Sequence, residues 1–155
     1  MPATSPAKPR IFVDADVLFA GEASPSEHGA SLLTLRMAEI TLVEAITSEQ
    51  VIAEAERNLA EKLPQALPAF RLVASRCLHV VADPSTADLQ PYDGLADSED
   101  LPILVAALRE GCPWLVTFNV RHYQPGHPAV TVLRPGEFLL RVRDRLARLS
   151  GEGDP

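Results

Sequence analysis

The chain has 155 residues, of which 46% are hydrophobic and 23% are charged, a composition that fits one globular domain and excludes a disordered chain. No apolar run approaches the roughly 20 residues of a membrane helix, and residues 1–9 lack the apolar stretch of a secretory signal, so we expect them to be a flexible leader. The net charge of −7 argues against a nucleic-acid partner unless bound cations offset the acidic side chains.

In the first half of the chain, short apolar strands alternate with helices. The predicted elements are a buried strand over 10–14, small turn-like residues over 15–25, a helix over about 26–39, a strand over 40–46, a helix ending near Pro64, a helix over 66–76 and a strand over 78–81. Thr47 and Gln50 have the spacing of a capping box, which places the start of the helix that ends near Pro64.

The second half continues the same alternation. The predicted elements are a loop over 82–96, a helix over 98–110, a strand over 114–118, a loop over 119–127, a strand over 130–133, a helix from Pro135 to about Leu149 and a disordered tail over 150–155. The helix over 98–110 is apolar nearly all round between Ile103 and Leu108, which is typical of a helix buried on most sides.

This alternation predicts an α/β fold, a three-layer α/β/α sandwich with a central parallel sheet, in one domain over residues 10–149. In such sheets ligands bind at the carboxyl ends of the strands. Asp14 and Asp16 follow the first strand, and Thr117 and Asn119 close the strand over 114–118. These four residues are therefore the first candidates for a site.

Carboxylates gather at three places in the predicted fold. They are Asp14 and Asp16 after the first strand, Glu54 and Glu56 on the Thr47-capped helix, and Asp97, Glu99 and Asp100 at the start of the buried helix. Carboxylates brought together repel one another and stay ionised only if a cation joins them. Mg²⁺ binds carboxylates while keeping waters for substrate phosphates, and it lowers the pKa of a bound water that attacks a phosphodiester. The pattern favours a divalent-metal site.

Most of these acids also have a simpler structural interpretation. Asp97 fits a helix N-cap, and Asp100 fits a first-turn acid favoured by the helix dipole. Glu54 and Glu56 both flank the apolar face of their helix, so the helical wheel does not choose between them. Asp14 is different, because an acid directly after a buried strand is costly unless a site uses it.

For the arginines of the C-terminal helix and for the two cysteines, a structural role is a simpler interpretation than a functional one. Five arginines crowd the C-terminal helix, namely Arg134, Arg141, Arg143, Arg145 and Arg148, and a solvated face explains them. Cys77 and Cys112 provide no disulfide framework and are typical of small buried hydrophobes in a reducing cytoplasm.

Four segments, in order, resemble the PIN-domain family. IFVDADVLFAG resembles its opening strand, SEQVIAEAERNL is similar to its helix with a single Glu, and DSEDLPILVAALREGCPWLVTFNVRHY looks like the stretch that supplies the later acids and a Thr-x-Asp or Thr-x-Asn terminus. VTVLRPGEFLLRV is similar to the closing segment of the bacterial VapC-like branch. The resemblance covers residues 10 to about 142 and implies the PIN-like, Rossmann-like topology.

The resemblance also implies a site and an activity. It makes Asp14 the first metal ligand, Glu54 rather than Glu56 the second acid, Asp100 the third and Asp97 a neighbouring acid, with Thr117 supporting the site. It implies a cytoplasmic endoribonuclease that uses Mg²⁺ or Mn²⁺, commonly a homodimer and the toxin of a type II toxin–antitoxin pair, restrained by an antitoxin. The apolar residues of the helix over 26–39 fit either a dimer interface or the core.

Three positions depart from the family pattern. Asp16 replaces the more usual Asn, and Asn119 stands where many members have a fourth Asp, which leaves a less negative site and favours one metal over two. His122 stands where related chains have Asp or His; a base or a phosphate contact is one interpretation, but a lone loop histidine is more often neither.

Two alternative functions fit parts of the sequence. Asp14-Ala15-Asp16 after an apolar strand also fits a haloacid-dehalogenase-type phosphatase with Asp14 as nucleophile, which would need Lys62 as its lysine. A catalytically degenerate PIN fold that serves as a binding module is favoured by Asn119 and the acidic net charge, and opposed by the four remaining acids.

Overall fold

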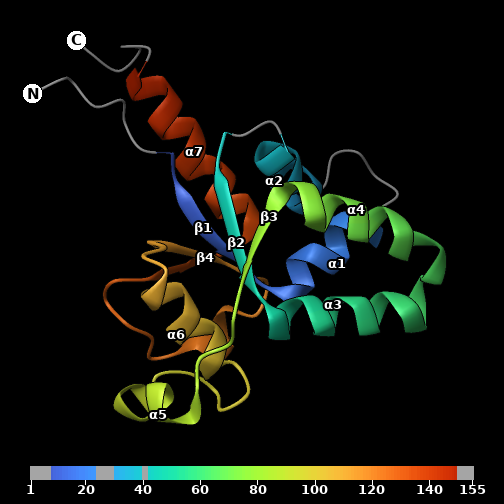
Figure 1. The fold of residues 1–155 in the computed structure, drawn as a ribbon. Coiled ribbons are helices and arrows are strands. Elements are labelled where there is room, and N and C mark those ends of the chain that lie inside the picture. Colours follow the sequence, from blue (N-terminus) through green and yellow to red (C-terminus); the bar gives the residue numbers. More distant parts are fainter. Residues whose placement is uncertain (1–7, 24–29, 40–41, 150–155) are drawn as a thin grey trace, which may run out of the picture.

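The computed structural model describes residues 8–23, 30–39 and 42–149 (Figure 1). Within these residues five strands form one sheet in the order β3-β2-β1-β4-β5, and every neighbouring pair is parallel. The strands are β1 (Arg10–Val13), β2 (Glu44–Ser48), β3 (Leu78–Val81), β4 (Trp114–Val116) and β5 (Thr131–Leu133). In the register of the sheet, Phe12 of β1 lies between Ile46 of β2 and Leu115 of β4.

Helices cover both faces of this sheet. They are α1 (Ala15–Ala23), α2 (Ala30–Glu39), α3 (Glu49–Lys62), α4 (Leu67–Cys77), α5 (Thr86–Leu89), α6 (Leu101–Arg109) and α7 (Pro135–Leu149), with 3-10 helices η1 (Pro64–Ala66), η2 (Gln90–Tyr92) and η3 (Val120–Tyr123). Figure 1 shows α1, α3 and α4 on one side of the sheet and α5 and α6 on the other. Because α2 contacts α1, α4 and α7, it joins the first layer. The predicted three-layer α/β/α fold is confirmed.

Burial follows the hydrophobic pattern of the elements. Residues 11–13 of β1 are completely buried, and α3 turns Val51, Ala55 and Leu59 inward at a spacing of four residues, as expected of an amphipathic helix. In α6, residues 103–107 are all buried, which matches the prediction of a helix buried on most sides. Cys112 is buried and burial raises the pKa of its thiol to about 12, whereas Cys77 is half-buried.

The strand order reverses between β1 and β4, and this reversal positions the site. From β1 the chain continues to β2 and β3 on one side of the sheet, and then returns to β4 on the other side of β1. The helices on either side of such a switch point diverge and leave a crevice at the carboxyl ends of the two strands. Asp14 and Thr117 are the first residues after β1 and β4, so both lie at this crevice.

Several local predictions were wrong. The loop predicted over 82–96 contains α5 and η2, and the loop predicted over 119–127 contains η3. The strand predicted over 40–46 is β2 at Glu44–Ser48, and residues 40–41 of that prediction lie outside the described residues. Residues 15–23, predicted as turn-like, form α1, which begins directly after β1 because the carbonyl of Asp14 accepts the N–H groups of Val17 and Leu18. The N-cap of α3 is Ser48, not Thr47, and its side chain accepts the N–H of Val51. Thr47 stays in β2, where its hydroxyl donates to the carbonyl of Val13 at 2.9 Å.

The predicted start of α6 was also wrong, because this helix begins at Leu101 and not at residue 98. The carbonyl of Asp97 accepts the N–H groups of Asp100 and Leu101, so residues 98–100 form a turn. Asp97 is therefore not the N-cap. Asp100 is in that position, and within the described chain its side chain makes no capping hydrogen bond.

Parts of the predicted ends and of one helix lie outside the described residues. These parts are 1–7 of the expected leader, the expected tail over 150–155, and residues 26–29 of the helix predicted over 26–39. In the described part of that helix, Leu35 and Ala38 are buried in the core. Among the described helices, none has both the length and the hydrophobicity that a membrane span needs.

Candidate active site

Asp14 is the buried centre of the crevice. Its side chain is only 5% exposed, and it accepts three hydrogen bonds. Oδ1 accepts the N–H of Ala15 at 2.7 Å, and Oδ2 accepts the hydroxyls of Thr117 at 2.9 Å and Tyr123 at 2.7 Å. Hydrogen bonds to an ionised carboxylate are about twice as strong as neutral ones, so these donors offset the cost of burying the charge and fix its orientation.

Asp16 lies on the first turn of α1, beside Asp14. Its Oδ2 accepts the N–H of Phe118 at 3.0 Å and lies 3.3 Å from the hydroxyl oxygen of Thr117. That hydroxyl has one proton, and the shorter distance of 2.9 Å assigns it to Asp14. Burial, and then the neighbouring charge of Asp14, raise the pKa of Asp16 to about 6. The predicted supporting role of Thr117 therefore has a geometric basis, since one hydroxyl lies between two carboxylates.

Tyr123 belongs to this site and was missed in the sequence. It is the last residue of η3 and is only 2% exposed. Burial and the charge of Asp14 raise the pKa of its hydroxyl well above the usual range, so the group remains a donor. The signal was present: a large aromatic residue in an otherwise polar loop needs a partner for its hydroxyl if it is buried.

The structure distinguishes Glu54 from Glu56, the two glutamates of α3 that were considered for the site. Glu56 forms an ion pair with Arg71 of α4, at 3.6 Å between Oε1 and Nε. The pKa of Glu54 is instead raised, first by partial burial and then by the carboxylate of Asp14. Of Glu54 and Glu56, Glu54 is therefore the one whose pKa the charge of Asp14 raises, and its role as the second acid stays a prediction.

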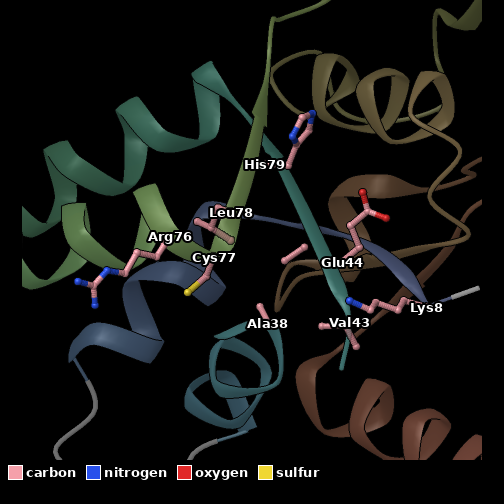
Figure 2. A pocket seen from close by; sticks show the side chains of 9 residues that line it. Lys8, Ala38, Val43, Glu44, Arg76, Cys77, Leu78 and His79 are labelled. Atoms are coloured by element: carbon pink, nitrogen blue, oxygen red, sulfur yellow. The ribbon is translucent and has the colours of Figure 1, made fainter. Parts of the chain in front are cut away.

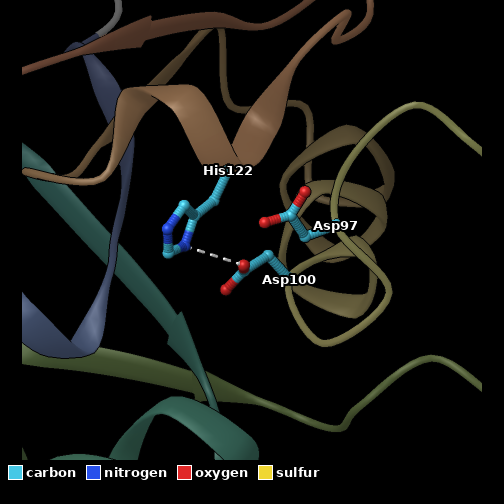
Figure 3. Close-up of side chains that lie close together, drawn as sticks. All are labelled: Asp97, Asp100 and His122. Carbon is cyan, nitrogen blue, oxygen red and sulfur yellow. Dashed lines mark ion pairs between the residues drawn. The ribbon is translucent and has the colours of Figure 1, made fainter.

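Asp97, Asp100 and His122 form a cluster at the mouth of the crevice (Figure 3). Each offers a ligand atom, and these atoms all lie within 4.8 Å of one another. Nδ1 of His122 lies 3.2 Å from Oδ2 of Asp100. With Ser98 and Glu99, the three residues line an open pocket of about 400 Å³.

The charges of Asp14, Glu54 and Asp97 all act on the carboxylate of Asp100. Burial raises the pKa of Asp100 to about 6, the charges of Asp14, Asp97 and Glu54 act in the same direction, and His122 opposes them. Carboxylates gathered in this way are a donor set that a hard divalent cation stabilises in the ionised form. Asn119, the remaining predicted site residue, is exposed, and its backbone N–H donates to the hydroxyl oxygen of Thr117 at 3.0 Å.

A second pocket, of about 370 Å³, lies at the opposite ends of the strands (Figure 2). It is lined by the amino ends of β2 and β3 and by residues of α2 and α4. Figure 2 shows Arg76 and His79 pointing away from each other, and Glu44 is paired with Arg10 at 3.4 Å. The charged groups do not converge on one point, so the acidic crevice remains the candidate active site.

Lys62 does not reach the crevice. It is the last residue of α3, and its Nζ lies 5.5 Å from the centroid of the Phe19 ring. Glu54, by contrast, lies two turns nearer the start of that helix. The lysine that a haloacid-dehalogenase-type phosphatase needs is therefore not supplied by this residue.

Comparison with known proteins agrees with this geometry. The fold is similar to a chain in the crystal structure of VapBC2 from Rickettsia felis bound to a promoter DNA fragment, with a TM-score of 0.58, 15% identity, and coverage of 81% of this chain and 98% of that chain. It is also similar to Mycobacterium tuberculosis VapC20, a sarcin-ricin loop cleaving toxin, with a TM-score of 0.50, 20% identity, and coverage of 68% and 86%. No curated protein sequence matches the chain. The family profile of the PIN domain matches residues 10–121, most of the sequence, and the chain belongs to the PIN-domain family.

Proposed function

We propose that this PIN-domain protein is an endoribonuclease that depends on Mg²⁺ or Mn²⁺. The observation that carries the proposal is the buried Asp14 at the switch point of the sheet, held by three hydrogen bonds and surrounded by Asp16, Glu54 and Asp100, whose pKa values its charge raises. A chain that gathers these charges into one crevice needs a cation there.

Each residue has a proposed role. Asp14, Glu54, Asp97 and Asp100 would hold the metal ion, which would polarise a phosphoryl oxygen and lower the pKa of a water. Thr117 fixes the Asp14 carboxylate by the hydrogen bond described above. Asn119, in the position of a fourth acid, leaves a less negative site, which favours a single metal ion.

The structural relatives support a proposal for the biological role. One of them is a chain in the structure of VapBC2, and another is a sarcin-ricin loop cleaving toxin. We therefore propose that this chain is the toxin of a type II toxin–antitoxin pair, acting on RNA in the cytoplasm, as a homodimer, and restrained by an antitoxin. Light scattering of the purified chain tests the dimer. A small DNA-binding protein encoded in the neighbouring reading frame, which restores growth on co-expression, tests the antitoxin.

The Asp14→Asn variant tests the activity. We expect it to abolish Mn²⁺-dependent cleavage of RNA while circular dichroism shows the parent fold, because the amide keeps the volume of the carboxylate but removes its charge. Asp144→Asn is the matched control, since Asp144 is an exposed acid on α7, and it should cleave like the parent. Chelation of divalent ions should stop the parent enzyme. Cleavage by Asp14→Asn at the parent rate would show that the site is wrongly assigned.

Asn119 favours a second candidate, a catalytically degenerate PIN fold that binds RNA or a protein without cleaving. Its prediction differs in one measurement: RNA binds but is not cleaved with any divalent ion. The phosphatase alternative predicts an aspartyl-phosphate on Asp14, which intact-mass spectrometry after incubation with a phosphate ester would detect. The position of Lys62 on Phe19 opposes that alternative.

A further inference from the structure

We infer that His122 is a nitrogen ligand of the metal centre and makes it prefer first-row transition ions over Mg²⁺. This inference rests on the proposed function, because it names the class of ion that the same site takes. The geometry that carries it is the cluster in Figure 3, where Asp97, Asp100 and His122 present their ligand atoms within 4.8 Å of one another. Ligand atoms of one ion lie at most about 4 Å apart, twice a bond of about 2.1 Å, so small side-chain rotations complete the set.

The main chain holds these residues in place. The N–H of Asp97 donates to the carbonyl of His122 at 2.7 Å, which ties η3 to the turn before α6. The N–H of Asp100 donates to the carbonyl of Asp97 at 2.9 Å, and the N–H of His122 donates to the carbonyl of Asn119 at 3.0 Å. Two segments that are distant in the sequence therefore present their side chains from a fixed backbone. Such pre-organisation is what a metal site requires of its ligands.

An ion pair between His122 and Asp100 is the simpler explanation of their contact, at 3.2 Å. It does not explain why the carboxylate of Asp97 approaches the same two groups. His122 is 48% exposed, and an ion pair that is largely open to solvent contributes little to stability. Three groups that all offer lone pairs to one small volume instead form a donor set with one nitrogen and two oxygens.

The nitrogen decides which ions bind well. Mg²⁺ prefers six oxygen ligands and keeps its waters, whereas an imidazole suits first-row transition ions, whose affinities for a nitrogen-containing site rise from Mn²⁺ to Co²⁺ and beyond. The expected order of affinity is therefore Co²⁺, then Mn²⁺, then Mg²⁺. Removal of the imidazole should weaken Co²⁺ and Mn²⁺ binding much more than Mg²⁺ binding.

Calorimetric titration of the metal-free full chain with Co²⁺, Mn²⁺ and Mg²⁺ tests this order in the parent, in His122→Asn and in the control His79→Asn. His79 is an exposed histidine on β3, at the other end of the sheet. We expect the ratio of Co²⁺ to Mg²⁺ affinity to fall about tenfold or more in His122→Asn and to stay within twofold of the parent in His79→Asn. Since His122 is half-exposed, both variants should fold.

Pulsed electron paramagnetic resonance of the Mn²⁺-loaded protein gives a direct readout. A bound imidazole produces a ¹⁴N modulation, which should be present in the parent and in His79→Asn and lost in His122→Asn. Absence of this modulation in the parent, or an unchanged affinity ratio in His122→Asn, overturns the inference. If the parent still cleaves RNA with Mg²⁺, only the inference about His122 fails. If the parent binds none of the three ions and chelation leaves cleavage unchanged, the proposed metal dependence fails with it.

Discussion

The hydroxyl of Tyr123 donates a 2.7 Å hydrogen bond to Oδ2 of Asp14, across 109 positions of sequence. Through this contact, η3 after β4 fixes the carboxylate at the end of β1. Thr117, directly after β4, donates to the same oxygen at 2.9 Å. The strands β1 and β4 and the helix η3 are therefore connected through Oδ2 of Asp14. A change at Asp14, Thr117 or Tyr123 should affect both the stability of the fold and the site.

Tyr123→Phe tests this connection. The variant keeps the ring and removes only the donor, so it leaves a buried carboxylate with one hydrogen bond fewer. We expect the free energy of unfolding to fall by about 2 kcal/mol, the usual contribution of a hydrogen bond to a charged group. RNA cleavage should also slow, because the orientation of Asp14 is less well fixed. Urea denaturation measures the first effect.

Tyr92→Phe is the control for that experiment. Tyr92 is half-buried and packs edge-to-face on His127, with ring centroids 6.1 Å apart, away from Asp14. We expect it to keep the parent stability within about 0.5 kcal/mol, as surface changes do. An equal loss of unfolding free energy in Tyr123→Phe and Tyr92→Phe would mean that the hydrogen bond to Asp14 does not stabilise the fold.

Glu54 and Glu56 of α3 provide a matched pair for the next prediction. Glu54→Gln should reduce Mn²⁺ affinity by about tenfold or more, as changes around metal sites commonly do, because it removes a charge close to that of Asp14. Glu56→Gln should leave metal affinity unchanged, since Glu56 pairs with Arg71 of α4. Calorimetry measures both. The reverse result would assign the second acid to Glu56.

The raised pKa values predict how stability depends on pH. Asp16 and Asp100 have pKa values of about 6 in the folded chain, above the value of about 3.9 for an unfolded Asp. Between these values the folded state binds more protons than the unfolded state, so stability falls as pH rises. We expect the metal-free protein to melt at a higher temperature at about pH 5.5 than at about pH 7.5.

Added Mn²⁺ should reverse that order, because the ion needs ionised carboxylates and so stabilises the chain more at the higher pH. Differential scanning calorimetry with and without the ion measures both effects. Asp100→Asn should flatten the pH dependence of the metal-free protein, because it removes one of the two shifted groups. If the melting temperature of Asp100→Asn depends on pH as strongly as that of the parent, other residues titrate in this pH range.

Much of the fold was predictable because it depends on local pattern. Buried strands and amphipathic helices alternate along the chain, and this is enough to predict a parallel sheet and to place Asp14 at a carboxyl end. The start of α3 was predicted one residue early. The reason is tertiary: the hydroxyl of Thr47 donates to the carbonyl of Val13, so Ser48 is left to cap the helix.

The site was less predictable, because its contacts join residues that are far apart in the sequence. Tyr123 and His122 lie in a segment whose local pattern indicates only a loop. The contact of Tyr123 with Asp14 depends on β4 lying beside β1, and that of His122 with Asp100 depends on the backbone pairing of η3 with the turn before α6. Neither arrangement is encoded in the spacing of the residues concerned.

Gly126 closes the loop that carries His122 and Tyr123, and its replacement is the last prediction. Its φ is +79°, a conformation that other residues adopt only at a cost, and its N–H donates to the carbonyl of Leu95 at 2.8 Å. A Cβ at this position would lie 2.9 Å from the carbonyl oxygen of Tyr123. Gly126→Ala therefore combines backbone strain with a contact that pushes on Tyr123.

Gly94→Ala separates these two effects. Gly94 has a similar φ of +84°, but none of the described residues comes within 4 Å of the position that a Cβ would take there. We expect Gly94→Ala to lower the free energy of unfolding by about 1 kcal/mol, from strain alone. Gly126→Ala should lose about 1–2 kcal/mol more and should also weaken Co²⁺ binding, because the displaced loop carries His122. If the two variants are equally stable and bind Co²⁺ equally, the loop absorbs the methyl group, and the position of His122 does not depend on this turn.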